Sequence, residues 1–147
     1  MAATTHIPAQ VSIEEYLHTV YKPDCDYVDG EIEERAVGEY DHATWQTALI
    51  MFFSPRQKEW GVRVLPELRV RVAPRRVRIP DVCLLSRTAP IEQVITHPPL
   101  AVFEILSPED RMVRVLERLA DFEGVGVGAI WVIDPQRSIY YLSLIHI

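Results

Sequence analysis

Two acidic residues stand alone inside apolar, strand-like runs of this sequence. Glu104 lies within Val102-Phe103-Glu104-Ile105-Leu106, and Asp81 lies within Ile79-Pro80-Asp81-Val82-Cys83-Leu84. A carboxylate is costly to bury in a strand unless it is paired, hydrogen-bonded or bound to a cation. Two such oxygen ligands on rigid strands suit Mg²⁺ or Mn²⁺ better than zinc. The alternative for each acid is a solvent-exposed strand end or a structural ion pair.

The patterns around these acids predict the elements that must position them. Ser12 and Glu15 form a capping-box pattern that predicts a helix up to about Val20, and Asp29-Gly30 predicts a hairpin with its acids on a solvated face. Longer helices are expected at 39–57 and 108–123, and strands at 62–65, 68–72, 77–85, 100–106, 129–133 and 138–144. This order predicts a mixed α/β (α+β) domain at 11–147, with one sheet flanked by helices, after a flexible tail at 1–10.

Three local features bear on the two acids. Pro80 cannot donate to a strand ladder, so we expect a bulge beside Asp81. Ser107-Pro108 is typical of a helix start directly after the strand that carries Glu104. On that helix Arg118 lies about 100° from the centre of the apolar stripe, so it could reach the end of the sheet from the flank.

Composition limits the class of protein. The chain has 147 residues and is 48% hydrophobic, which predicts one globular domain. No apolar run approaches the roughly 20 residues that cross a bilayer, and no signal pattern opens the sequence. We therefore expect a cytoplasmic protein without a membrane partner. Cys25 and Cys83 offer neither a disulfide framework nor zinc-ligand spacing and are expected as buried free thiols.

Charge is distributed unevenly along the chain. The net charge of −6 argues against a strong general nucleic-acid binder. Residues 63–78, however, hold six arginines against the single Glu67, a local charge of +5 that leaves −11 for the remainder. An arginine band of this kind could contact phosphates locally. The residues expected to contact a DNA backbone are Arg69, Arg71, Arg76 and Arg78.

Several short motifs, taken in order, resemble a known family. Pro80-Asp81 followed by Glu104-x-Leu106 is similar to the signature of the PD-(D/E)XK, restriction-endonuclease-like nuclease superfamily. The chain resembles most closely the Uma-two-type bacterial restriction endonuclease family, also called domain of unknown function 820, over roughly residues 12–142. The further motifs that carry this resemblance are Asp26-Tyr27-Val28-Asp29-Gly30-Glu31, Gly38-Glu39 with His42, Ile105-Leu106-Ser107-Pro108, Asp110-Arg111, Phe122, Gly126-Val127 and Trp131-Val132-Ile133-Asp134-Pro135.

The resemblance implies a restriction-endonuclease-like mixed central sheet and a metal site. It implies that Asp81, Glu104 and the main-chain carbonyl of Ile105 hold the ion. It also implies that Glu39 lies near the site as a catalytic residue, with His42 and Gln46 as accessory residues. From the residues alone, Glu39 is equally explained by its place at a helix start, and His42 by an ordinary surface or core histidine.

The sequence departs from the superfamily pattern at one position. The lysine expected at the third place of the signature is Leu106, and the basic residue that the resemblance places on the following helix is Arg118. Arginine keeps the positive charge and could stabilise a phosphorane as a catalytic residue, but it cannot transfer a proton as lysine can.

These features predict a Mg²⁺- or Mn²⁺-dependent endonuclease that hydrolyses DNA phosphodiester bonds through metal-activated water. The alternative is a catalytically inactive nuclease-fold module that binds DNA or a protein partner, which the missing lysine and the acidic charge favour. The oligomeric state stays open, with a homodimer among the options. Residues 142–147 read like a translated transposon adapter end, so we expect a truncated reading frame with a foreign tail.

Overall fold

The computed structural model describes residues 10–36 and 38–144. The tail predicted at 1–10 lies almost wholly outside the described residues, and so does the last half of the segment at 142–147. The helices are α1 (Ile13–Leu17), α2 (Tyr40–Phe53), α3 (Gln57–Trp60) and α4 (Met112–Val125), with a 3-10 turn at Ser54–Arg56. The strands are β1 (Cys25–Val28), β2 (Glu31–Glu34), β3 (Val62–Pro66), β4 (Val70–Ala73), β5 (Arg76–Arg78), β6 (Val82–Ser86), β7 (Ala101–Ile105), β8 (Ala129–Asp134) and β9 (Ile139–Leu144).

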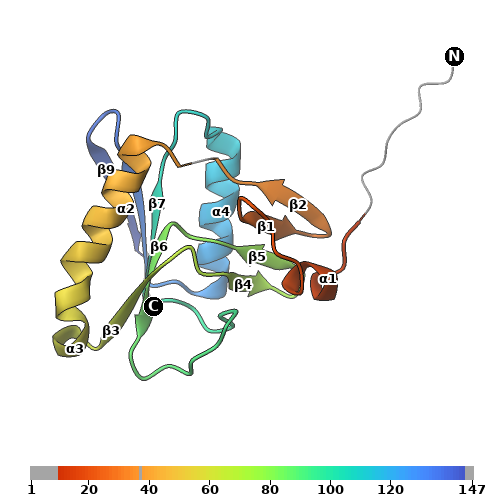
Figure 1. Cartoon of the computed structure of the whole chain (residues 1–147), viewed down its shortest axis with the longest axis horizontal. Coiled ribbons are helices and arrows are strands. Elements are labelled where there is room, and N and C mark those ends of the chain that lie inside the picture. Colours follow the sequence, from red (N-terminus) through yellow and green to blue (C-terminus); the bar gives the residue numbers. More distant parts are fainter. Residues whose placement is uncertain (1–9, 37, 145–147) are drawn as a thin grey trace, which may run out of the picture.

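A mixed central sheet organises the molecule (Figure 1). Its strand order is β3-β6-β7-β8-β9, in which β7 and β8 are parallel and the other neighbours are antiparallel. The helix α4 makes the crossover between the two parallel strands, as a strand–helix–strand unit requires. The predicted mixed α+β fold, with a central sheet flanked by helices, is therefore confirmed. The structure also contains a second, antiparallel sheet of order β2-β1-β5-β4. The sequence analysis predicted one sheet and did not distinguish this second one.

Strand alternation determines which face of the central sheet each side chain joins. On β7, Phe103 and Ile105 pack toward α2, whereas Val102 packs toward α4. Glu104 lies two residues from Val102, so the period of two turns it toward α4 as well. The same rule on β6 sends Val82 to the α2 core and Cys83 to the α4 core. The sheet is thus covered by apolar contacts on both faces, with one acid directed at α4.

The prediction of a single strand at 77–85 is wrong. It divides into β5, which belongs to the antiparallel sheet, and β6, which belongs to the central sheet. The break falls at Ile79-Pro80-Asp81, and Pro80 explains it because proline has no N–H to continue a ladder. The chain therefore passes from one sheet to the other instead of forming the expected bulge, and Asp81 lies at this junction.

The two long helices also differ from the prediction. The first ends at Phe53 because Pro55, inside the range predicted as helix, lies in a 3-10 turn. Most residues of this helix are exposed. The second begins at Met112, since residues Ser107 to Asp110 form a turn in which the Asp110 carboxylate accepts the Ser107 N–H at 2.7 Å. It ends at Val125, two residues beyond the prediction, with Gly126 in the left-handed conformation at φ 98°.

Several smaller features agree with the sequence. Ser12 caps α1 by accepting the Glu15 N–H at 3.1 Å, although this helix ends at Leu17 and not at Val20. Asp29-Gly30 joins β1 and β2 in the expected hairpin. Cys25 and Cys83 are buried free thiols. In the part of the chain that the structure describes, no helix is long and apolar enough to cross a membrane.

Candidate active site

The carboxylate of Asp81 is held by groups from three other segments. Its Oδ1 accepts a hydrogen bond from Arg35 Nη2 at 2.7 Å and lies 3.1 Å from His42 Nε2. Its Oδ2 accepts the main-chain N–H of Ile105 at 2.7 Å. Gln46 donates to the Asp81 main-chain carbonyl at 2.9 Å, so one turn of α2 contacts both parts of this residue. The site residues predicted on the first long helix, His42 and Gln46, thus lie beside the predicted metal ligand.

The carboxylate of Glu104 faces Arg118. Arg118 Nη2 lies 2.7 Å from Glu104 Oε2 and also donates to the Ile79 carbonyl at 3.2 Å. Both Asp81 and Glu104 are only 4% exposed. The second oxygen of Glu104, Oε1, is buried without a hydrogen-bond partner among the described residues. Because Asp81 bonds the residue next to Glu104, the structure brings both acids and Arg118 to the same end of the central sheet.

The environment moves the pKa values of this pair in opposite directions. Burial raises the pKa of Glu104 to about 8, against the opposing charge of Arg118 and in the same direction as the nearby charge of Asp81. Burial would raise the pKa of Asp81 too, but the hydrogen bond from His42 and the charge of Arg35 hold it below its usual range. The same hydrogen bond raises the pKa of His42. Two carboxylates with separated pKa values are typical of a functional site.

Two residues of this cluster were missed by the sequence analysis. Asp26 is 2% exposed and accepts the Ile79 N–H at 3.1 Å, and its other oxygen lies 3.6 Å from Arg118 Nε. Arg35, just after β2, pairs with Asp81 and lies 4.0 Å from Asp26. Asp26 interrupts the apolar run from Cys25 to Val28, which is the same signal that singled out the other two acids. The expectation that the hairpin acids form a solvated face is therefore wrong for Asp26.

The four arginines predicted to contact DNA form ion pairs or hydrogen bonds within the protein. Arg78 has no exposed surface and pairs with Asp121, Glu33 and Asp26 at 2.7, 2.9 and 3.2 Å, so it cannot reach a phosphate. Arg76 pairs with Asp29 and Asp121, each at 2.8 Å. The two remaining candidates are partly buried and donate to main-chain carbonyls, Arg69 to Leu17 at 3.3 Å and Arg71 to Pro74 at 2.6 Å.

Glu39 is exposed at the N-cap of α2 and does not cap the helix with its side chain. None of the hydrogen bonds or ion pairs among residues 10–36 and 38–144 involves its carboxylate. The structure therefore connects Asp81, Glu104, Arg118, His42 and Gln46 by direct contacts, and it places Glu39 one turn before His42, at the start of α2.

The donor set fits a hard divalent cation. Asp81 and Glu104 offer carboxylate oxygens, and the buried, unpartnered Oε1 of Glu104 is an acceptor in need of a partner. No group of three or more acidic, histidine or cysteine side chains in the described segments could hold an ion. Two protein carboxylates are nevertheless sufficient for Mg²⁺, because this ion is commonly bound by one or two carboxylates and completes its coordination shell with water and phosphate oxygens.

The comparison with known proteins follows this geometry. The sequence profile of a family described as "Uma2: Putative restriction endonuclease" matches residues 13–140. The chain belongs to the Uma2 family. No curated protein matches this sequence. The Uma2 profile thus covers every residue of the cluster around Asp81 and Glu104.

A solved structure has the same fold as this Uma2 chain. It is a crystal structure of "a putative nuclease belonging to DUF820" from Anabaena variabilis ATCC 29413, similar with a TM-score of 0.81 at 20% sequence identity. The alignment covers 91% of this chain and 79% of that chain. At this identity the similarity supports the fold and leaves the chemistry to the site itself.

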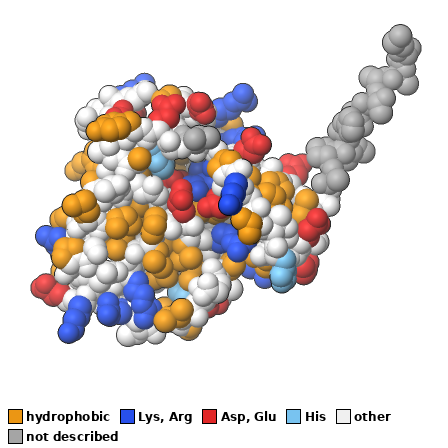
Figure 2. Space-filling model, viewed as in Figure 1, with side chains coloured by type: hydrophobic (Ala, Val, Ile, Leu, Met, Phe, Trp, Pro, Cys, Tyr) orange, Lys and Arg blue, Asp and Glu red, His pale blue; other side chains and the backbone are white. Residues whose placement is uncertain are grey.

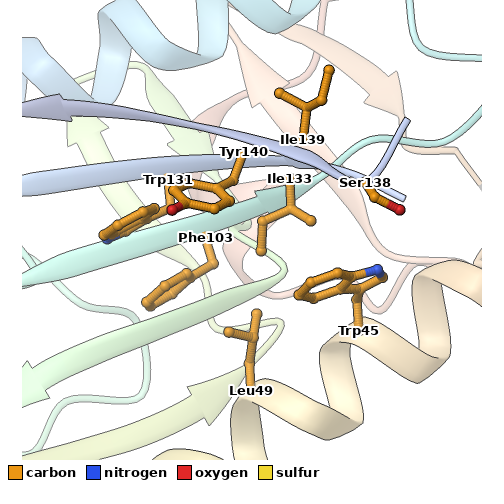
Figure 3. A pocket seen from close by; sticks show the side chains of 8 residues that line it. All are labelled: Trp45, Leu49, Phe103, Trp131, Ile133, Ser138, Ile139 and Tyr140. Carbon is orange, nitrogen blue, oxygen red and sulfur yellow. The ribbon is translucent and has the colours of Figure 1, made fainter. Parts of the chain in front are cut away.

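An apolar pocket lies on the other face of the central sheet (Figure 3). It has a volume of about 270 Å³ between α2 and the strands β7, β8 and β9. The pocket is lined mainly by aromatic and aliphatic side chains, together with Ser138. The aromatic and aliphatic residues are Trp45, Leu49, Phe103, Trp131, Ile133, Ile139 and Tyr140. It contains no acid or base, so the acidic cluster toward α4 is the better candidate for chemistry.

Proposed function

We propose that this Uma2 chain is a metal-dependent endonuclease that hydrolyses DNA phosphodiester bonds at Asp81 and Glu104. The observation that carries the proposal is the convergence of these two buried carboxylates beside Arg118, with one Glu104 oxygen left without a partner. Buried acids are rarely left in this state without a function. Membership of a family described as a restriction endonuclease supports DNA as the substrate.

The residues of the chain would divide the work as follows. Asp81 and Glu104 would hold Mg²⁺ or Mn²⁺, with the carbonyl of Ile105 as a further ligand. When bound, such an ion supplies a Lewis acid and a bound water of lowered pKa, the nucleophile. His42 would orient Asp81 through its hydrogen bond to Oδ1. Arg118 would stabilise the charge that develops on the phosphoryl oxygens, since a guanidinium stays protonated and cannot act as a base.

A polar cavity offers a route for the phosphate. It has a volume of about 330 Å³ and is lined by Arg35, Arg111 and Arg114, together with Glu34, Ala36, Glu109 and Asp110. Arg35 connects this cavity to Asp81, because its Nη2 donates to the carboxylate. Arg111 and Arg114 are exposed, and no ion pair in the described chain involves them. Exposed guanidinium groups beside the acids would attract the DNA backbone and position it.

The test is the conversion of supercoiled plasmid to nicked and linear forms in Mg²⁺ or Mn²⁺. The proposal predicts metal-dependent cleavage that Asp81→Ala or Glu104→Ala abolishes. Glu117→Ala, which changes an exposed acid next to Arg118 on α4, is the matched control and should cleave normally. Cleavage that survives in either site variant would refute the assignment of these two acids.

A second candidate function has an observation in its favour. Arg118 stands where the family resemblance leads us to expect lysine, and it pairs with Glu104 through a buried contact of 2.7 Å. An inactive module that binds DNA or a protein partner through the same fold would tolerate both features. Intact DNA binding without cleavage by the wild type, or by Arg118→Lys, would favour this candidate.

A further inference from the structure

A set of basic side chains at the other end of the molecule is free of acidic partners. Among the described residues, no ion pair involves the four members of this set, in contrast to Arg76 and Arg78. These four residues lie in the segments 56–63 and 85–87. The single acid in these segments is Glu59, so their net charge is +3. The members of this set, which we call the α3 patch, are Arg56, Lys58, Arg63 and Arg87.

Aromatic rings are part of the same surface. Phe52 and Trp60 are 49% and 50% exposed, with ring centroids 6.1 Å apart. The Arg56 guanidinium lies 4.1 Å from the Phe52 centroid and 5.6 Å from that of Trp60. Figure 2 shows basic side chains gathered over α3 and the start of β3, beside exposed apolar surface. Positive charge and half-exposed aromatic rings together are typical of surfaces that bind single-stranded nucleic acid.

Register places Arg87 within this patch. Its main-chain N–H donates to the carbonyl of Gly61 at 2.8 Å, so it adjoins the residue that follows Trp60. Arg63 lies on β3 between Val62 and Val64, which pack toward α2, so its side chain leaves the opposite face of the strand and donates to the Ala89 carbonyl at 3.5 Å. The patch therefore runs from α3 around the sheet edge at β3 to the turn that follows β6.

Two elements run from the candidate active site to the α3 patch. The helix α2 contacts Asp81 through Gln46 in its first half and leads at its C-terminal end to Arg56. The strand β6 begins directly after Asp81 and ends directly before Arg87. At about 1.5 Å per helical residue, the path from Gln46 to Arg56 is about 15 Å long. At about 3.3 Å per strand residue, the path from Asp81 to Arg87 is about 20 Å long.

We infer that the α3 patch binds a single-stranded stretch of DNA that continues, over about 15–20 Å, from the bond held at Asp81 and Glu104. The inference rests on the proposed action on DNA. Lys58 and Arg87 contact phosphates, and Trp60 stacks on a base. In a duplex the base faces are already stacked on one another and cannot stack on Trp60. The Trp60 ring therefore favours single-stranded over double-stranded DNA. The patch thereby supplies the backbone contacts that the arginine band cannot make.

The test is fluorescence anisotropy of labelled dT20 and of a 20-base-pair duplex, in EDTA so that no cleavage occurs. The wild type should prefer dT20. Lys58→Glu combined with Arg87→Glu should weaken binding about tenfold and reduce the salt slope by about 1.4, the loss of two phosphate contacts on a single strand. Trp60→Ala should lower the preference for dT20 about tenfold, and Trp60→Phe should largely restore it. Arg75→Glu, at an exposed residue of the arginine band, is the matched control and should bind like the wild type.

Equal weakening by the patch variant and by Arg75→Glu would overturn the inference. So would a wild-type preference for the duplex, or competition by polyglutamate as strong as that by unlabelled dT20, which would indicate nonspecific charge or a protein partner. Failure of the proposed function has a different signature. Patch-dependent binding without metal-dependent nicking refutes catalysis alone, whereas nicking with patch-independent binding refutes the patch alone.

Discussion

Replacing Arg118 by glutamine should increase the affinity of the site for Mn²⁺. The Arg118 guanidinium lies 2.7 Å from Glu104 Oε2, within a cluster that excludes most water. A cation that uses Glu104 must compete with this contact. Glutamine keeps hydrogen-bonding capacity but removes the positive charge, so the carboxylate becomes a freer ligand. The same variant should lose cleavage, because the charge that faces the phosphate is also gone.

The size of the effect follows from the ion pair that the metal replaces. At a pH above about 8, where Glu104 is ionised, unit charges with centres about 4 Å apart interact by about 4 kcal/mol at an effective dielectric constant of about 20. Hydration of the released guanidinium in the wild type offsets part of this, and a net change of about 2 kcal/mol corresponds to roughly 30-fold tighter binding. Isothermal titration calorimetry with Mn²⁺ measures it directly.

Arg114→Gln is the matched control, since Arg114 lies one turn earlier on α4 and is exposed. Its Mn²⁺ affinity should equal that of the wild type. A far-UV circular dichroism melt checks that Arg118→Gln is folded at the titration temperature, because loss of a buried partner can cost about 3–5 kcal/mol. Weaker or unchanged Mn²⁺ binding by a folded Arg118→Gln would refute the reasoning.

Three further predictions concern stability. Glu104 should make the folded protein less stable as pH rises from 4.5 toward about 8, because the folded state retains a proton there that the unfolded chain loses at its ordinary pKa; Glu104→Gln should flatten this dependence in urea titrations. Asp26→Asn should lower the free energy of unfolding by about 3 kcal/mol, since it removes the charge opposite buried Arg78. Gly126→Ala should destabilise the protein by about 1 kcal/mol because its φ is 98°, whereas Gly124→Ala should stabilise it by a similar amount.

Specific outcomes would contradict these three. A wild type as stable at pH 8.5 as at pH 5 would show that burial does not hold a proton on Glu104. An Asp26→Asn variant with an unchanged urea midpoint would mean that Arg78 is compensated by its other partners alone. Equal effects of alanine at Gly124 and Gly126 would contradict the left-handed end of α4.

The sequence predicted those parts of the site that depend on local pattern. An acid inside an apolar strand run identified Asp81 and Glu104, and helical spacing placed Arg118 within reach of them. These inferences succeed because burial of a lone carboxylate is exceptional and because the helical period is a geometric constant.

The parts that failed depend on long-range pairing. No local pattern showed that Ile79-Pro80-Asp81 joins two sheets, since both flanking segments have equally good strand patterns. The ion pairs of Arg78 connect segments that lie more than 40 residues apart in sequence, so the arginine band read as a free surface. Arg35 was hidden for the same reason, whereas Asp26 carries the same local signal as Asp81 and Glu104. The partners of Arg35 and Asp26 are defined by the second sheet, which the sequence did not separate from the first.

Anomalous scattering from crystals soaked in Mn²⁺ would test the central claim most directly. The account predicts one peak bonded to both the Asp81 and Glu104 carboxylates, with Arg118 moved off Glu104 Oε2. Crystals of Asp81→Asn should lack this peak. An anomalous map without a peak at these carboxylates, with the contact of 2.7 Å between Arg118 and Glu104 intact, would contradict it.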